Sequence, residues 1–299
     1  DHVTKIHQTH NIHQHLDLIA GLPYEDIYSF QRSFDYVYAL APDQLQLGFL
    51  KVLKGSEMSK KAFEYGIVYQ NRAPYEVLYT RWMSYDDMIL LKQMEEMVEI
   101  YYNSGQYVNT ISFWNRYFDS SFEMFRYLVE YYLKNFLFSQ SQSRISQYHI
   151  LYQCMMDFFG HEQGDMKVSS KKEIPKKEKA VLIAKELLLY DLYLRENLKT
   201  RPQFAKDVVD IKKAQHILRN QKELTKNCHV EWFDKEMLPF LTVDYPETET
   251  QQAEEWNSLF QQHLADDLQS QKARGRYLCI FDYDRRTVLY LSAHTYAIF

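Results

Sequence analysis

The chain has few residues of the kinds that interrupt regular structure: 8 glycines and 7 prolines among 299 residues. So few turn formers leave room for long helices. Cysteine is also scarce, and Cys154, Cys228 and Cys279 lie far apart in the sequence. This spacing excludes a C-x-x-C metal motif and argues against a disulfide framework. We therefore expect inert, buried, reduced thiols in a cytoplasmic protein.

Long apolar runs and a strong charge of one sign are missing too. No run approaches the roughly 18 apolar residues of a membrane-spanning helix. The net charge of -5 offers no basic surface for nucleic acid or an anionic membrane. What the chain has in excess is aromatic residues, with 25 Tyr and 18 Phe. We expect helices around aromatic cores, and neither a nucleic-acid nor a membrane partner.

Two short apolar runs near the N-terminus, residues 14–22 and 44–50, flank a stretch in which apolar side chains recur at helical spacing from Ile27 to Val37. Strand, helix and strand within about 35 residues indicate one βαβ unit with parallel strands. Runs of this kind are typical of strands that are covered on both faces.

Helical periodicity then takes over. Ser84 with Asp87 three residues later predicts a helix start of the capping-box kind. Apolar spacing predicts helices over residues 84–103, 122–136, 145–159, 179–198 and roughly 249–271. Lys-rich residues 161–178 have little to bury, so we expect an exposed loop there.

The C-terminal part is rich in β-forming residues. Tyr277–Tyr283 and Thr287–Leu291, joined by Asp284-Arg285-Arg286, predict a hairpin within residues 276–292, and Cys228–Phe233 predicts a third strand. The expected fold class is mostly α with minor β: a βαβ remnant of a partial (β/α) barrel, then a helical domain with a small antiparallel sheet.

The stretch from His15 to Glu25 resembles the fifth strand and following loop of the radical S-adenosylmethionine barrel, which carries an Ile-x-Gly pattern followed by a Glu. The matching residues are Ile19, Gly21 and Glu25. Residues 47–55 resemble the sixth and last barrel strand. The similar branch is preceded by a cobalamin-binding domain, and its members are often labelled anaerobic magnesium-protoporphyrin IX monomethyl ester cyclases. Later segments, such as 74–79 and 101–106, resemble an uncharacterised C-terminal extension in part of that branch.

The resemblance implies a site at the carboxyl end of the strands. Ile19 would offer an apolar contact to the adenine of S-adenosylmethionine. Gly21 would let the backbone approach the cofactor closely. The Glu25 carboxylate would lie at a helix start, where the dipole favours negative charge. These three residues are the expected cofactor-binding wall, and no residue of the chain is expected to be catalytic.

The family's chemistry also needs a [4Fe-4S] cluster on three cysteines at C-x-x-x-C-x-x-C spacing, which this sequence lacks. The resemblance therefore implies an excised fragment that is inactive alone, and whose partners are an N-terminal barrel and a cobalamin-binding domain. The domains would be residues 1–58, the end of the barrel, and residues 59–299, the extension. Strand edges left open by the missing barrel could pair across a dimer or be capped by the chain's own helices.

Other interpretations of the same residues remain open. The chain could be a non-catalytic helical interaction module. His7, His10, His13 and His15 could bind a metal, although solvated histidines on a helix are the expected interpretation. The aromatic stripes could line a pocket for a flat ring, but at helical spacing they are expected to be core.

Overall fold

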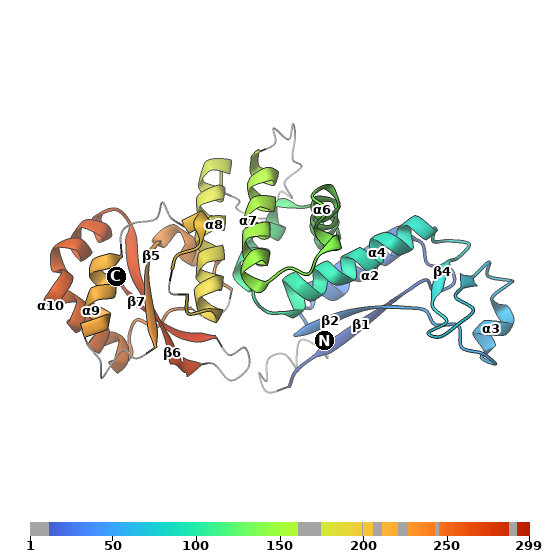
Figure 1. Cartoon of the computed structure of the whole chain (residues 1–299), viewed down its shortest axis with the longest axis horizontal. Coiled ribbons are helices and arrows are strands. Elements are labelled where there is room, and N and C mark those ends of the chain that lie inside the picture. The colour runs from blue at the N-terminus through green and yellow to red at the C-terminus, as the bar shows by residue number, and fades with distance from the viewer. Residues whose placement is uncertain are drawn as a thin grey trace. The chain divides into compact units, whose positions relative to one another are not determined.

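The computed structural model describes residues 12–160, 175–198, 200–205, 211–220, 227–242, 245–286 and 292–299. The chain folds as two compact units (Figure 1). Unit 1 contains residues 1–104 and 118–141, and unit 2 contains residues 105–117 and 142–299. Helices from residues 85–98 and 121–134 pack with the N-terminal βαβ segment in unit 1, so the compact units differ from the two expected domains, whose boundary at residue 58 stays a prediction.

Unit 1 begins with the expected βαβ unit. Strand β1 (His15–Ala20) and strand β2 (Gln44–Phe49) pair in parallel, and helix α2 (Ile27–Ala39) connects them. The remaining elements are α3 (Glu57–Lys61), β3 (Val68–Tyr69), β4 (Val77–Tyr79), α4 (Tyr85–Val98), the π-helix η1 (Glu99–Asn103), α6 (Ser121–Lys134) and the 3-10 turn η3 (Leu137–Ser139).

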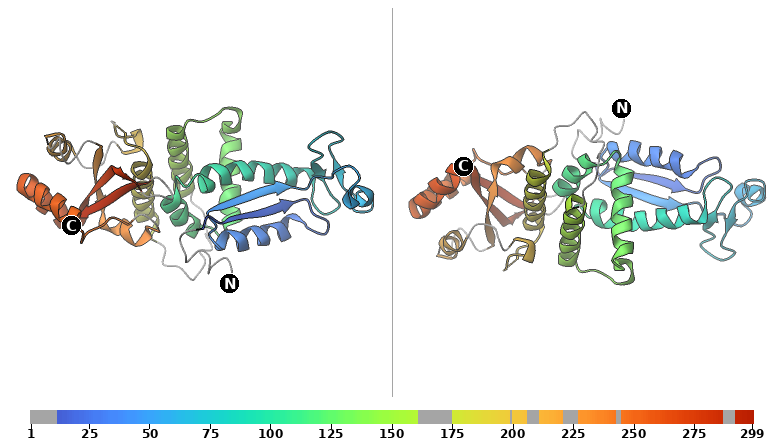
Figure 2. Two further views of the ribbon diagram at one scale, coloured as in Figure 1. Left: turned by 90° about the horizontal axis from the view of Figure 1, so that it is seen from below. Right: turned by 90° about the horizontal axis from the view of Figure 1, so that it is seen from above.

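The parallel sheet is covered on one face only, so the expectation of burial on both faces was wrong. Helices α2 and α4 flank the two parallel strands (Figure 2), and Leu45, Leu47 and Phe49 of β2 are buried. The side chains that alternate with them are exposed or partly exposed, including Asp17 and Ile19 of β1. Because helices cover only one side of the two parallel strands, the other face of this sheet is free.

Local capping explains where two helices begin. Ser84 Oγ accepts the Asp87 N–H at 3.1 Å, and Asp87 Oδ2 accepts the Ser84 N–H at 2.9 Å. This reciprocal pair is the capping box that the sequence predicted at the start of α4. Asp26 and Ser29 make the same arrangement at the start of α2. Both helix starts therefore satisfy backbone donors without help from the rest of the fold.

Unit 2 is built on an antiparallel sheet in the order β5-β6-β7, made of β5 (Cys228–Asp234), β6 (Arg276–Arg286) and β7 (Ala293–Ile298). Its helices are α5 (Val108–Trp114), α7 (Arg144–Gly160), α8 (Lys177–Arg195), α9 (Lys212–Asn220) and α10 (Gln251–Ala273). Short 3-10 turns are η2 (Asn115–Tyr117), η4 (Gln203–Ala205) and η5 (Lys235–Phe240).

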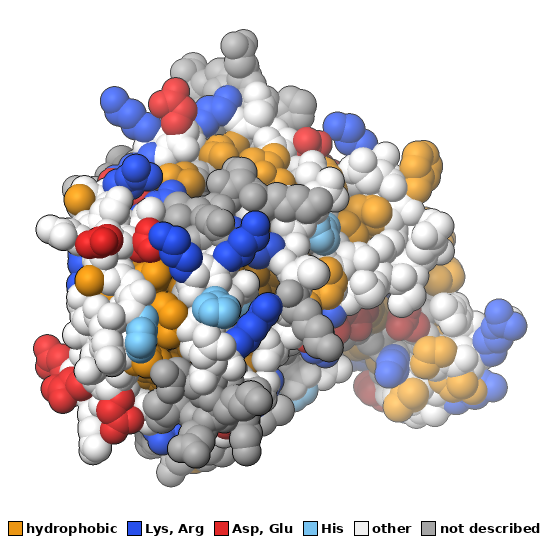
Figure 3. Space-filling view, turned by 60° about the vertical axis from the view of Figure 1, so that its left-hand side comes forward, with side chains coloured by type: hydrophobic (Ala, Val, Ile, Leu, Met, Phe, Trp, Pro, Cys, Tyr) orange, Lys and Arg blue, Asp and Glu red, His pale blue; other side chains and the backbone are white. Residues whose placement is uncertain are grey.

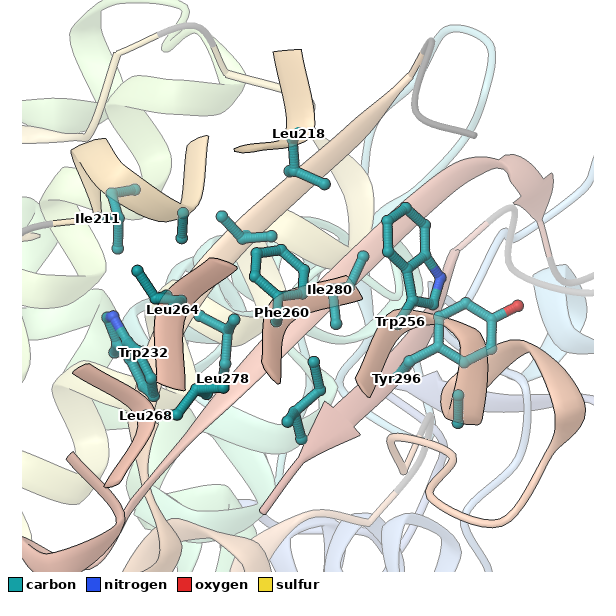
Figure 4. Close-up of a cluster of buried hydrophobic side chains, with 14 residues drawn as sticks. Ile211, Leu218, Trp232, Trp256, Phe260, Leu264, Leu268, Leu278, Ile280 and Tyr296 are labelled. Atoms are coloured by element: carbon teal, nitrogen blue, oxygen red, sulfur yellow. The ribbon is translucent and has the colours of Figure 1, made fainter. Parts of the chain in front are cut away.

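Both faces of this sheet are covered. On one face, apolar side chains of α9 and α10 pack against alternate strand residues (Figure 4), among them Trp232, Trp256, Phe260, Leu278 and Tyr296. On the other face, helix α8 places Tyr190 against Phe233 and Phe281, with ring centroids 5.5 and 5.4 Å apart. Aromatic pairs at this separation are favourable edge or tilted contacts. The aromatic stripe of α8 is therefore core, as expected from its spacing.

The helices expected from residues 84, 122, 145, 179 and 249 are all present within a few residues of their expected bounds. The hairpin differs in its turn: Asp284, Arg285 and Arg286 belong to β6. The strand that pairs with β6 is β7. The second strand expected at 287–291 lies outside the described residues. Of the loop expected over residues 161–178, residues 161–174 lie outside the described residues. The last two residues of that range belong to α8, which begins at Lys177.

Acidic and basic side chains are interspersed on the face that Figure 3 brings forward. In the described part of unit 2, the exposed large hydrophobic side chains are Leu182, Tyr245 and Phe299. The other large hydrophobic side chains that the described residues expose all lie in unit 1. Among the described residues, no helix has the length and apolar character needed to cross a membrane. Among the described residues, unit 1 therefore carries most of the exposed large hydrophobic side chains.

Candidate functional site at the end of strand β1

Ile19 lies on the uncovered face of the parallel sheet, close to the carboxyl end of β1. Its side chain is 48% exposed. In the register of the two strands it faces Gly48 of β2, which has no side chain to cover it. The carboxyl ends of parallel strands are where ligands bind in α/β folds. An exposed isoleucine here is suited to contact an apolar ligand surface.

Gly21 follows β1 at a φ of +87°, a conformation that glycine adopts without strain. A Cβ at this position would lie only 2.7 Å from Cγ1 of Val77 in β4. The space beside Gly21 is therefore filled by the chain's own Val77. The missing side chain of Gly21 thus makes room for strand β4, and the expected approach of its backbone to a cofactor stays a prediction.

Glu25 ends the loop after β1, directly before Asp26, the N-cap of α2. Its Oε2 atom is buried and has no hydrogen-bond partner among the described residues. Burial raises the pKa of the Glu25 carboxyl, and the neighbouring Asp26 carboxylate raises it further. A buried acceptor without a donor is costly unless water or a ligand supplies one. Glu25 Oε2 can therefore accept a hydrogen bond from a donor outside the chain.

The two edges of the parallel sheet differ. At the outer edge of β2, Asn103 Oδ1 accepts the Leu45 N–H at 2.9 Å, and Asn103 Nδ2 donates to the Leu45 carbonyl at 3.0 Å. Further along, the Val52 N–H donates to the Tyr75 carbonyl at 2.8 Å. The outer edge of β2 is thus partly occupied: a side chain bonds it at Leu45, and the segment that leads into β4 bonds the chain just beyond Phe49.

The outer edge of β1 is open. The N–H groups of Gln44 and Leu50 donate to the carbonyls of Gln14 and Ala20. Because backbone direction alternates along a strand, the backbone groups of His15, Asp17 and Ile19 point to the opposite edge. Among the described residues, no backbone or side-chain group bonds to that edge of residues 15–20. The outer edge of β1 is therefore open along its whole length, whereas that of β2 is partly occupied.

Within the described residues, no group of three or more His, Cys, Asp or Glu side chains is placed to bind a metal ion. Cys154 is buried in α7, while Cys228 and Cys279 lie on β5 and β6. Burial raises the pKa of all three thiols, that of Cys228 to about 12. These cysteines do not fit the three ligands of a [4Fe-4S] cluster.

The histidines near the N-terminus are only partly described. His7 and His10 lie outside the described residues. His13 is exposed and precedes β1 without being helical, so the expected helix does not include it. His15 begins β1, and its Nε2 lies 3.1 Å from Asp17 Oδ1 on the uncovered face of the sheet.

Sequence reasoning missed the buried charged groups of unit 2. Asp191 of α8 accepts hydrogen bonds from the backbone and side chains of Asn109 and Thr110, at 2.6 to 3.3 Å. Glu231 of β5 is paired in a bidentate manner with Arg201, with Nε to Oε2 at 2.8 Å. Both carboxylates are saturated with donors from the chain. Asp191 holds the start of α5, and Glu231 holds Arg201 at the edge of β5. No pattern in the sequence predicts these pairs, because the partners lie about 80 and 30 residues apart.

A family model described as a protein of unknown function (DUF4080) matches residues 63–264. The chain therefore belongs to this family. The domain is found in proteins of the radical S-adenosylmethionine and cobalamin type. No curated protein matches the chain. The match begins after β2, so it includes β4 with Val77 but not the β1 segment with Ile19, Gly21 and Glu25.

Proposed function

We propose that this chain is the C-terminal part of a radical S-adenosylmethionine enzyme in which β1 and β2 are the last two strands of the barrel. The observation that carries the proposal is the asymmetry of the parallel sheet, whose outer edge is partly occupied beside β2 and open beside β1. A last strand needs a closed edge, and a penultimate strand needs an open one. The uncovered face of the sheet would be the inner face of the barrel.

The occurrence of this family in proteins of the radical S-adenosylmethionine and cobalamin type supports the proposal. In such an enzyme the [4Fe-4S] cluster and S-adenosylmethionine supply reductive cleavage of a carbon–sulfur bond. The cluster ligands would come from the barrel sequence that precedes β1, and a cobalamin-binding domain would precede the barrel. A tetrapyrrole is the substrate class that the cyclase label of the similar branch suggests.

The residues of this chain would bind and orient the cofactor and would not react. Ile19 would pack against the adenine, because it is apolar, exposed and at the carboxyl end of β1. Glu25 Oε2 would accept a hydrogen bond from the ribose or the amino group, since its present surroundings give it no donor. Gly21 would act indirectly, by letting Val77 hold β4 against the loop that carries Glu25.

Hydrogen exchange tests whether the outer edge of β1 is open. In the 299-residue chain, the amides of His15, Asp17 and Ile19 should exchange rapidly, while the amide of Leu45, held by Asn103, should be protected. In a longer protein whose reading frame continues upstream of Asp1, the three β1 amides should become protected. Rapid exchange at all three in the longer protein would mean that no strand is added beside β1.

Activity tests the cofactor wall. In the longer protein, Ile19→Ala and Glu25→Gln should each lower the yield of 5′-deoxyadenosine from S-adenosylmethionine by about tenfold, since one lost contact of 1–2 kcal/mol has that effect. Glu57→Gln is the matched control, because the Glu57 side chain is 68% exposed in α3. Unchanged yields in the two wall variants would remove these residues from the site.

A second candidate function is that of an interaction module without catalysis. The observation that favours it is the exposure of large aromatic side chains in unit 1, with Phe63 97% and Phe136 82% exposed. Large apolar side chains exposed to solvent can mark protein contacts. The upstream reading frame separates the two candidates: cysteines at C-x-x-x-C-x-x-C spacing favour the enzyme, and a start codon directly before Asp1 favours the module.

A further inference from the structure

The backbone at Tyr24 is in a conformation that a tyrosine rarely adopts. The Glu25 N–H donates to the Leu22 carbonyl at 3.3 Å, which closes a four-residue turn over residues 22–25. Pro23 is the second residue of this turn and Tyr24, at a φ of +67°, is the third. This is the arrangement of a type II turn, whose third residue is usually Gly or Asn. A strained residue of this kind is a reason to look for a function.

The Tyr24 ring belongs to a group of three aromatic side chains. Its centroid lies 4.6 Å from that of Trp82 and 5.8 Å from that of Tyr65, and the last two are 6.2 Å apart. Despite both contacts Tyr24 remains 72% exposed. The turn therefore holds a large ring against two others while leaving most of its surface free.

The three rings come from different parts of unit 1. Tyr24 lies in the loop after β1, next to Glu25, whereas Tyr65 and Trp82 lie on either side of the β3–β4 pair, in the segment that the family model matches. Contact of Gly21 with Val77 fixes β4 against the same loop. The aromatic group is thus placed at the carboxyl end of β1, beside the proposed cofactor wall.

A positive charge adjoins the rings. The Arg81 guanidinium lies 5.8 Å from the centroid of the Trp82 ring, and its Nη2 donates to the Glu64 carbonyl at 2.7 Å. Arg81 is exposed, and a guanidinium has five N–H donors, so further donors can reach a ligand. A planar cation beside one exposed and two half-buried rings is suited to a flat ligand that carries a carboxylate.

We propose that Tyr24, Tyr65 and Trp82, together with Arg81, form a binding site for a flat unsaturated ring that bears a carboxylate. The rings contact the faces of the ligand, and Arg81 pairs with its carboxylate. The assignment of this ligand as the substrate rests on the function proposed above, whereas binding of the ring does not, because all four residues belong to the chain described here.

The test is a titration of the 299-residue chain with 2-naphthoate, followed through the indole N–H signals in the NMR spectrum. Trp82 is half-buried, whereas Trp114, Trp232 and Trp256 are buried. The Trp82 signal, assigned with Trp82→Phe, should move while the other three stay in place. No movement of the Trp82 signal at millimolar 2-naphthoate would overturn the proposal.

Two substitutions at Tyr24 separate binding from folding. Tyr24→Gly and Tyr24→Asn both suit the positive φ, and the relief of backbone strain offsets the loss of the ring contacts, so the chain should stay folded with little change in melting temperature. Both should weaken 2-naphthoate binding about three- to tenfold, the effect of one lost aromatic contact. Tyr28→Ala, which removes another exposed ring on α2, should leave binding unchanged. Equal affinity in the two Tyr24 variants and the native chain would contradict the proposal.

Neutral 2-naphthalenemethanol tests the charge. It should bind more weakly than 2-naphthoate to the native chain, and Arg81→Gln should abolish that preference. A preference that persists in Arg81→Gln would exclude Arg81 as the partner of the carboxylate. Ring binding without 5′-deoxyadenosine formation in the longer protein would contradict the proposed enzyme alone, while cleavage without ring binding would contradict this site alone.

Discussion

The amide of Asn103 pairs with both backbone groups of Leu45, accepting from its N–H at 2.9 Å and donating to its carbonyl at 3.0 Å. One side chain therefore occupies the position that the backbone of a neighbouring strand would take. The contact links the end of the π-helix η1 to the outer edge of β2, across 58 residues of sequence. The Asn103 side chain thus occupies part of the outer edge of β2, which is the strand at which the proposed barrel would end.

Asn103→Ala should destabilise the chain by about 1–3 kcal/mol, because it leaves two partly buried backbone groups without their partner. Urea unfolding measures the change. Asn135→Ala is a matched control: this asparagine donates to the Tyr131 carbonyl at an exposed helix end, and its loss should cost less than about 0.5 kcal/mol. Equal effects of the two substitutions would show that the β2 edge does not depend on Asn103.

Gly21→Ala should destabilise the chain by about 2 kcal/mol or more, since the new Cβ meets Val77 and the backbone has a positive φ. Val77→Ala removes the colliding methyl group. Combining the two should therefore cost less than the sum of the single changes, by about 1 kcal/mol, as measured in a double-mutant cycle. Strict additivity would mean that the two residues are not in contact.

The stability of unit 2 should decrease as the pH rises from about 4 to 7. Burial raises the pKa of Glu186 to about 7, although the Asp234 N–H, which donates to its Oε2, acts in the opposite direction. Because the folded state holds the proton more tightly, the stabilisation is complete below the ordinary pKa of a glutamate. It is lost as the pH rises through the raised value.

Glu186→Gln keeps an acceptor for Asp234 but cannot ionise. The dependence of the free energy of unfolding on pH should become flatter by on the order of 1–3 kcal/mol over this interval. Burial raises the pKa of Asp191 to about 6, so part of the slope should remain in the variant. A slope that is unchanged by the substitution would assign the pH dependence to other groups.

Arg201→Met should destabilise the chain by about 3–5 kcal/mol, because it leaves the fully buried Glu231 carboxylate without its counter-charge. The double variant Arg201→Met with Glu231→Leu should recover part of that loss. Lys60→Ala is the control, since its pair with Glu57 is exposed and should contribute less than about 1 kcal/mol. Urea unfolding of the three variants provides the comparison.

Local patterns predicted the elements whose causes are local. The Ser84–Asp87 capping box, the apolar spacing of α6 and α7, and the βαβ unit over residues 15–49 are all set by residues close in sequence. Short elements such as α5 were missed. No side chain of its own caps this helix, and its first N–H groups are satisfied by Asp191, some 80 residues away.

The candidate site was predictable only in part. The Ile19, Gly21 and Glu25 pattern could be found by resemblance, but the role of Gly21 could not. What its missing side chain makes room for is Val77, which is 56 positions further along the chain. The contact between Tyr24 and Trp82 is of the same kind. Long-range pairs of this type are fixed by packing in three dimensions, and no periodicity in the sequence records them.

The sheet in unit 2 is closed in a different way. At the β5 edge, the N–H groups of Trp232 and Asp234 donate to the side chains of Glu231 and Glu186, and at the β7 edge Glu247 bonds to the backbone of Thr295 and Ala297. Among the longer strands that the structure describes, β1 alone has an outer edge without bonds along its whole length. One such edge can pair with one partner strand. Association through β1 should therefore yield a discrete complex and not a growing filament.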